Sequence, residues 1–181
     1  MTPFTSFQKI ARLTRDCTIT EKIDGTNASI FISDDLSEFL IGSRTRWITP
    51  QDDNHGFARW ATEHKDELMQ LGSGHHFGEW WGLGIQRSYG MKEKRFSLFN
   101  THRWSDAAGA RPACCSVVPV LYEGIFSTTS AGIMIDMLSS GGSLASPGFM
   151  KPEGVVIYHH AAKQLFKKTI EKDDKPKGSP E

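Results

Sequence analysis

The stretch Glu21-Lys22-Ile23-Asp24-Gly25-Thr26-Asn27 contains the most informative residue of this chain, Lys22. β-type sequence lies on both sides of it, so residues 18–32 are expected to form a hairpin with Asp24-Gly25 near the bend. A lysine fixed beside such a tight turn can act as a nucleophile, because without its proton it attacks an electrophilic phosphorus. This prediction depends on whether the rest of the chain supplies the groups that phosphoryl transfer needs.

Length and composition indicate one domain of 181 residues with a hydrophobic core. The 21 basic and 21 acidic residues balance, which argues against a generally basic coat protein but allows a local basic groove. No apolar run is long enough to span a bilayer, and residues 1–4 lack a signal-peptide pattern. Cys17, Cys114 and Cys115 have no zinc-binding spacing, and we interpret them as reduced, mostly buried thiols of a cytoplasmic protein.

Hydrophobic periodicity predicts many strands and two helices in an order that does not alternate. This order favours an α+β fold with largely antiparallel sheets. One helical stripe covers residues 57–71 and is stopped by Gly72-Ser73-Gly74, and a second covers residues 128–138. The remaining segments are strands predicted at residues 39–48, 77–83, 95–100, 117–122, 155–159 and 164–170, and a charged, loose tail at residues 171–181.

Two of these segments carry groups that suit phosphate or sugar. Arg44 and Arg46 alternate on a predicted strand, so they share one face, and guanidinium groups donate to phosphate in a fork. Glu79 lies inside an apolar stretch, where a carboxylate costs free energy unless it is paired or bound. Glu79 could therefore hydrogen-bond a ribose hydroxyl or help to hold a metal. The alternatives are a solvated strand face for the arginines and an outward-facing Glu79.

Two further segments carry a possible base stack and a possible metal site. An aromatic residue of the stretch 95–100 could stack on a nucleobase, although core packing would also explain the pattern. Glu153 opens an apolar strand, and oxygen ligands at such a place suit Mg²⁺ that bridges substrate phosphates. Lys167 or Lys168 could neutralise an α-phosphate. A solvated glutamate at the start of a strand and a surface lysine pair are the alternatives.

Taken together and in this order, the segments resemble the covalent nucleotidyltransferase superfamily of RNA ligases, DNA ligases and mRNA capping enzymes. The motif K-x-D/H-G, with its nucleophilic lysine, is matched by Lys22-Ile23-Asp24-Gly25, and the likeness is greatest to ATP-dependent RNA ligases, where an asparagine follows. The later matches are Asn27 for that asparagine, Arg44, Phe77-Gly78-Glu79, Phe96-Ser97-Leu98-Phe99, Glu153-Gly154-Val155-Val156 and Lys167-Lys168. The resemblance covers residues 22–168.

The resemblance implies an adenylation domain of the nucleotidyltransferase, ATP-grasp-like type, spanning residues 1–181. The chain differs from the family in two respects. The last motif usually has two lysines separated by one residue, whereas Lys167 and Lys168 are adjacent, so Lys167 is the safer assignment. The chain also ends soon after this motif, and we expect no OB-fold or other C-terminal domain.

The implied activity is AMP-forming ligation of RNA. Lys22 attacks ATP and becomes lysyl-AMP, the AMP moves to an RNA 5′-phosphate, and an RNA 3′-hydroxyl then displaces it. Glu79 is expected on the ribose, Phe99 on the adenine and Glu153 on Mg²⁺ or Mn²⁺, with Glu79 as a second candidate metal ligand. The expected catalytic residues are Lys22, Asp24 and Lys167, and the expected nucleotide contacts are Glu21, Lys22, Asn27, Arg44, Glu79, Phe99, Glu153, Lys167 and Lys168.

Three alternatives remain open at this point: a DNA ligase, an mRNA guanylyltransferase, and a non-catalytic module that binds nucleotide or RNA. RNA would have to bind a local surface, since the net charge is zero. The histidine pairs 75–76 and 159–160 are not expected to bind metal, because neighbouring strand residues point to opposite faces. The candidate RNA contacts are Arg44, Arg46, Arg87, Lys92, Lys94, Arg95 and Arg103, with Trp47, Trp81 and Tyr89 as stacking residues.

Overall fold

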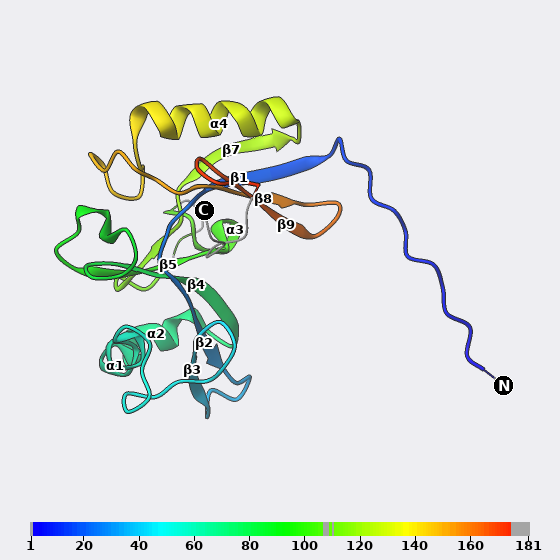
Figure 1. Ribbon diagram of the computed structural model, residues 1–181. Helices are drawn as coiled ribbons and strands as arrows, with labels where there is room; N and C mark the ends of the chain where they lie inside the picture. Colours follow the sequence, from blue (N-terminus) through cyan, green and yellow to red (C-terminus); the bar gives the residue numbers. More distant parts are fainter. Residues whose placement is uncertain (1, 107–108, 110, 175–181) are drawn as a thin grey trace.

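The computed structural model describes residues 2–106, 109 and 111–174. It confirms an α+β fold with mostly antiparallel sheets. One sheet has four strands in the order β7-β1-β8-β9, and the other has five in the order β3-β2-β4-β5-β6. Helix α4 covers one face of the first sheet, and α1 and α2 cover one face of the second (Figure 1).

The segment around Lys22 connects the two sheets, and the predicted hairpin is wrong. β1 (Asp16–Lys22) pairs with β7 (Val120–Ile125) and β8 (Gly154–His159), whereas β2 (Thr26–Ile32) pairs with β3 (Phe39–Gly42) and β4 (Gly74–Gly82). The reason is burial: both strands are apolar enough to be central strands, and Ile19 and Ile30 fill different cores. The three residues between the strands, 23–25, carry the chain from one sheet to the other.

The five-stranded sheet continues through β4 into β5 (Lys94–Leu98) and then β6 (Cys115–Val117). Behind it lie α1 (Phe57–Glu63), α2 (Lys65–Leu68) and the short 3-10 helix η1 (Met69–Leu71), and α3 (Thr101–Trp104) follows β5. The predicted helix at 57–71 is thus confirmed in place but interrupted at His64, where φ is −103°. Gly72 ends it with a φ of 74°, as its position predicts.

The four-stranded sheet is completed by β9 (Gln164–Thr169). Its helix α4 (Thr128–Gly141) begins at a capping box, in which Ser127 and Ser130 exchange side-chain and backbone hydrogen bonds. The single strand predicted at 117–122 is wrong, because β6 and β7 are separate strands of different sheets. The break falls at Val118-Pro119, where proline has no N–H for a ladder and its carbonyl accepts from the backbone of Glu21 at 2.9 Å.

The strand predicted at 39–48 is also shorter than expected. β3 ends at Gly42, and the backbone N–H of Ser43 donates to the carbonyl of Arg46 at 2.8 Å, which closes a turn. Arg44 and Arg46 therefore lie in this turn instead of sharing a strand face. Arg46 pairs with Asp52, and the chain returns to bridge Gly42 with Trp47.

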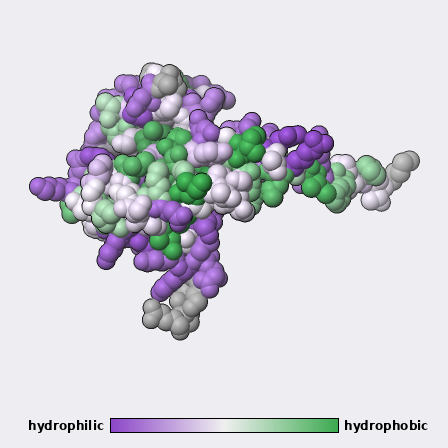
Figure 2. Space-filling model, turned by 90° about the horizontal axis from the view of Figure 1, so that it is seen from above, coloured by the Kyte–Doolittle hydropathy of each residue, from purple (hydrophilic) through white to green (hydrophobic). Residues whose placement is uncertain are grey.

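The N-terminal residues leave the body as an extended arm (Figures 1 and 2). Phe4, Phe7 and Ile10 are almost fully exposed, and the arm joins the body where the Leu13 carbonyl bonds His159 Nε2 at 2.7 Å. At the other end, the predicted tail is exposed at residues 171–174 and lies outside the described residues from 175 onward. No helix within the described residues has the length and hydrophobicity needed to cross a bilayer.

Candidate active site

Lys22 lies at the end of β1 and meets Glu153, which immediately precedes β8. Lys22 is opposite Gly154 in the antiparallel register, so the neighbouring Glu153 is brought to the lysine side chain. Lys22 Nζ donates to Glu153 Oε2 at 2.6 Å, and both side chains are mostly buried. The two residues are 131 positions apart, and their contact is what the sequence motifs predict for one shared site.

Glu79 approaches the same point from the five-stranded sheet. Its Oε1 accepts from the backbone N–H of Gly25 at 3.0 Å, and its Oε2 accepts from Asn27 Nδ2 at 3.1 Å. Burial raises the pKa of Glu79 to about 7; the charge of Lys22 and these two hydrogen bonds oppose the shift, while the charge of Glu153 adds to it. Electrostatic coupling of Glu79 to both Lys22 and Glu153 shows that the three groups form one cluster.

Asp24 has a partner that the sequence did not reveal. Its Oδ2 accepts from Arg87 Nε at 3.0 Å, and Arg87 also donates to the carbonyl of Lys151 at 3.0 Å. The Asp24 backbone N–H donates to the buried hydroxyl of Tyr89 at 2.9 Å. Arg87 thus connects the turn after Lys22 to the segment before Glu153. The sequence feature that could have indicated this role is the glycine-rich loop that contains Arg87.

Glu21 points away from this cluster, because it is adjacent to Lys22 on a strand. Its carboxylate accepts from the Ser143 hydroxyl at 2.5 Å and from the backbone N–H groups of Leu144 and Ala145 at 2.8 and 2.9 Å. Burial raises the pKa of Glu21, and these hydrogen bonds oppose the shift. Glu21 therefore anchors the loop after α4, a role that sequence reasoning missed.

The aromatic residues near the site divide into buried and open ones. Phe96 is fully buried against Phe57, with ring centroids 5.0 Å apart, whereas Phe99 is exposed. Strand alternation places Phe99 on the face that carries Glu79 and Ser97. Trp81 and Tyr89 are each only 1% exposed, so their prediction as RNA-stacking residues is wrong: both fill a core with Ile23 between the sheets.

The register of β9 separates the two adjacent lysines. Lys167 is opposite Val156 and Lys168 is opposite Val155, whose buried side chain packs under α4. Lys167 therefore shares the inner face with Lys22, while Lys168 lies on the α4 face and contacts Asp173 at 3.4 Å. Of these two lysines, only Lys167 lies on the face of the sheet that carries Lys22 and Glu153.

Arg44 lies in the turn after β3. Because Gly42 is opposite Ser29, this turn is at the end of β3 nearest Asn27. Most other predicted RNA-contacting cations have partners within the protein. Arg95 pairs with Glu93, Arg103 donates to the Leu71 carbonyl at 2.8 Å, and Lys94 donates to the His55 carbonyl at 2.7 Å.

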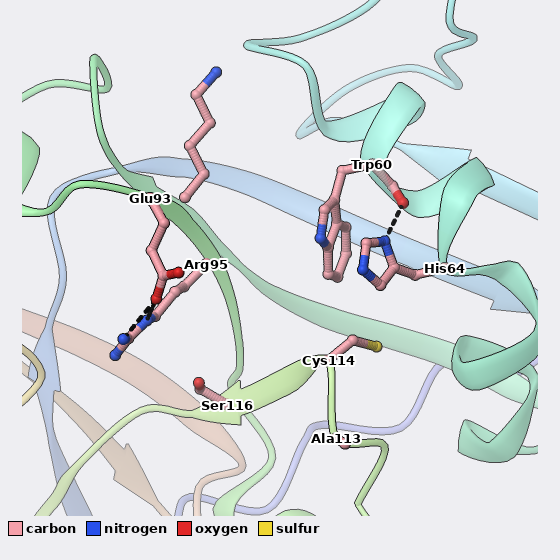
Figure 3. A pocket seen from close by; sticks show the side chains of 8 residues that line it. Trp60, His64, Glu93, Arg95, Ala113, Cys114 and Ser116 are labelled. Atoms are coloured by element: carbon pink, nitrogen blue, oxygen red, sulfur yellow. Dashed lines mark hydrogen bonds and ion pairs between the residues drawn. The ribbon is translucent and has the colours of Figure 1, made fainter.

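A separate cavity of about 370 Å³ lies at the edge of β5, beyond the start of β6. Figure 3 shows Trp60 and His64 on one wall, facing Glu93 and Arg95 on the other. Its lining includes none of the residues of the Lys22 cluster, so it is not part of the candidate active site.

The cluster fits a divalent cation that arrives with substrate phosphates. No group of three or more His, Cys, Asp or Glu side chains suited to a metal is found among the described residues. Glu153 and Glu79 are nevertheless two buried carboxylates at one point, and Mg²⁺ is usually held by one or two carboxylates together with phosphates. Glu79 already uses both oxygens as acceptors, so Glu153 is the better placed ligand.

Comparison with known proteins gives the family of this chain. The RNA ligase family profile matches residues 15–170, and the chain belongs to this family. No curated protein matches the sequence.

Solved structures with the same fold include several mutants of the RNA ligase of Naegleria gruberi. An apo form is 22% identical with a TM-score of 0.64, covering 86% of this chain and 50% of that one. A form with ATP and Mn is 20% identical with a TM-score of 0.63 and covers 88% and 51%. A form with AMP and Mn is 21% identical with a TM-score of 0.64 and covers 86% and 49%. This chain thus spans about half the length of those proteins.

Proposed function

We propose that this chain is the adenylyltransferase domain of an ATP-dependent RNA ligase, which joins RNA 5′-phosphate and 3′-hydroxyl ends through a lysyl-AMP intermediate. The observation that carries the proposal is the convergence of Lys22 and Glu153 from one sheet with Glu79 and Asn27 from the other. A protein that only bound nucleotide would not need a nucleophile at this point. Family membership and the ATP and Mn complexes of the Naegleria enzyme support it.

In the first step, Lys22 Nζ separates from Glu153 Oε2, which accepts its hydrogen bond, and gives up its proton to the solvent. Its lone pair forms a bond to the α-phosphorus of ATP, and the bond from that phosphorus to the pyrophosphate oxygen breaks. Lys167, on the same face, is suited to neutralise charge on the α-phosphate. Mg²⁺ or Mn²⁺ at Glu153 would supply further charge neutralisation when bound.

The remaining nucleotide contacts follow from the faces of the strands. We assign the ribose to Glu79 and the adenine to Phe99, which share the open face of the five-stranded sheet. Asn27 holds Glu79 through its amide, and Arg44 is suited to phosphate. Glu21 and Lys168 point to the α4 side, so we propose that they support the strands without touching the nucleotide. Asp24 positions the turn through Arg87.

The later steps bring in RNA. An oxygen of an RNA 5′-phosphate attacks the AMP phosphorus and releases Lys22, and an RNA 3′-hydroxyl then attacks the activated phosphate and releases AMP. The three cysteines are free in the structure, which supports the proposal that the protein acts in the reducing cytoplasm.

The test is intact-protein mass spectrometry before and after incubation with ATP and Mg²⁺. We expect a gain of one AMP, located at Lys22 by peptide mapping. The variant Lys22→Ala should show no gain, and Lys9→Ala, a change in the extended arm, should match the wild type. A gain from GTP but not from ATP, or an AMP adduct on Lys22→Ala, would overturn the proposal.

A further inference from the structure

Four aromatic rings form a row on the open face of the five-stranded sheet. Trp47 and Phe77 are 50% and 54% exposed, and His75 between them is also exposed. His75 is stacked on Phe77 with ring centroids 4.2 Å apart, and on Trp47 at 5.6 Å. Phe31 meets His75 edge-on at 5.8 Å and Trp47 at 6.2 Å. Because His75 is stacked between Trp47 and Phe77, the open ring faces of this stack are those at its two ends, on Phe77 and Trp47.

The fold builds this row on the strands that carry the site. Phe31 lies four residues from Asn27 on β2, and Phe77 and His75 lie two and four residues from Glu79 on β4. Residues two and four apart on a strand share a face, so the row and the site lie on one surface. Gly42 leaves space for the Trp47 indole: a Cβ there would be 3.3 Å from two atoms of that ring.

We propose that this row stacks the unpaired bases of RNA next to the end that reacts at Lys22. The inference rests on the function proposed above and names where its RNA lies. A strand rises about 3.4 Å per residue, so Phe77 and His75 lie roughly 7 and 14 Å from Glu79. Stacked nucleotides are spaced by roughly 3.4 Å, so the base on the open face of Phe77 is about the second from the reacting end, and the third and fourth pass along the row toward Trp47.

The chemistry of the surroundings favours RNA over a protein partner. Every base has a π-face, and stacking on aromatic rings is how proteins bind single strands without sequence preference. The charge of Lys22 acts on Glu79, which is two residues from Phe77, and Arg44 lies in the turn that precedes Trp47, so the phosphates of a strand meet positive charge. Beyond Phe31 the chain enters a turn that contains Asp34 and Asp35. These carboxylates repel phosphate, so the RNA bound along the row is limited to a few nucleotides.

The first test is binding of a short 5′-phosphorylated single-stranded RNA, measured by fluorescence anisotropy. Phe77→Ala and His75→Ala should each weaken binding at least about fivefold, whereas Phe77→Tyr, which keeps the ring, should bind like the wild type. The control is Phe166→Ala, which removes an equally exposed ring (52%) from the α4 face of the other sheet. All four variants should retain wild-type self-adenylylation and thermal stability, because the three side chains are exposed and are not among the residues assigned to the nucleotide.

A second measurement locates the RNA directly. RNA with 4-thiouridine at the second, third or fourth position should cross-link to the peptide that contains His75 and Phe77. Wild-type affinity in Phe77→Ala would overturn the proposal, as would a wild-type dimer that Phe77→Ala dissociates, since a second copy would then cover the row. Failure of the proposed function is a separate result: it appears as no AMP adduct on the wild type, whatever the RNA affinities are.

Discussion

Glu79 is held in a position that favours its protonated form. The pKa of this carboxyl is raised from its ordinary 4.5 to about 7, chiefly by burial. The folded protein therefore binds this proton more tightly than the unfolded chain does, and the resulting stabilisation is complete below about pH 4.5 and lost as the pH rises through about 7. The free energy involved is up to about 3 kcal/mol.

Glu79→Gln should remove this dependence. We expect the wild type to lose free energy of unfolding between pH 5 and pH 8 and the variant to lose less, because glutamine does not titrate. Chemical denaturation at a series of pH values measures both curves. Parallel curves for the two proteins would show that Glu79 has an ordinary pKa in the folded state.

Lys167 and Lys168 provide a matched pair of substitutions one residue apart. Lys167→Ala should slow AMP incorporation on the order of 100-fold, because it removes a cation from the inner face, where the phosphates are proposed to lie. Lys168→Ala, on the α4 face, should leave the rate within about twofold. The measurement is single-turnover adenylylation with labelled ATP, and the reverse order of effects would contradict the register argument.

At this scale the sequence motifs predicted which residues meet but not how each is held. Lys22, Asn27, Glu79 and Glu153 come together, as the resemblance implies. The bond from Arg87 to Asp24 could not be predicted, because it depends on a loop where Gln86, Ser88 and Tyr89 all have positive φ. Such conformations are set by tertiary packing and leave little trace in a single sequence.

The element that most constrains the site is the connection between β1 and β2. Gly25 lies against β4 so closely that a Cβ would be 2.4 Å from the carbonyl oxygen of Trp80 and 2.7 Å from Trp81 Cβ. Neither neighbour is the flexible end of a side chain, so a methyl group there must displace backbone. The same glycine donates its N–H to Glu79, and any displacement therefore moves a group of the site.

Gly25→Ala should destabilise the protein by about 1–3 kcal/mol and reduce adenylylation with it. Gly132→Ala is the matched control, since Gly132 lies inside α4 with no atom near its Cβ position. Alanine there should stabilise the helix by about 0.5–1 kcal/mol. Thermal unfolding of both variants tests the pair, and equal stability would show that the space at Gly25 is not needed.

Most helices and strands, such as α4 and β8, could be predicted because their hydrophobic residues recur with the period of a helix or a strand. The pairing of strands could not. The stretch 18–32 reads as a hairpin because its two halves have the same apolar alternation around Asp24-Gly25, yet each half is a central strand of a different sheet. Local turn signals do not distinguish a bend within one sheet from a connection between two.

In the molecule as a whole, the proposed site depends on the meeting of the two sheets. Lys22, Glu153 and Lys167 come from the four-stranded sheet, and Asn27, Glu79 and Phe99 from or beside the five-stranded one. A nucleotide that touches both groups links the sheets. It should therefore stabilise the whole fold instead of one sheet.

This prediction is best tested in Lys22→Met, which cannot form the covalent adduct, so that binding stays reversible. ATP with Mg²⁺ at 100 times its dissociation constant should stabilise this protein by about 2.7 kcal/mol. Adding Glu79→Gln on one sheet or Lys167→Ala on the other should reduce the stabilisation at the same ATP concentration, because each removes a contact from a different sheet. If only one of the two substitutions has this effect, the nucleotide is bound by a single sheet, which would contradict the proposed link between the sheets.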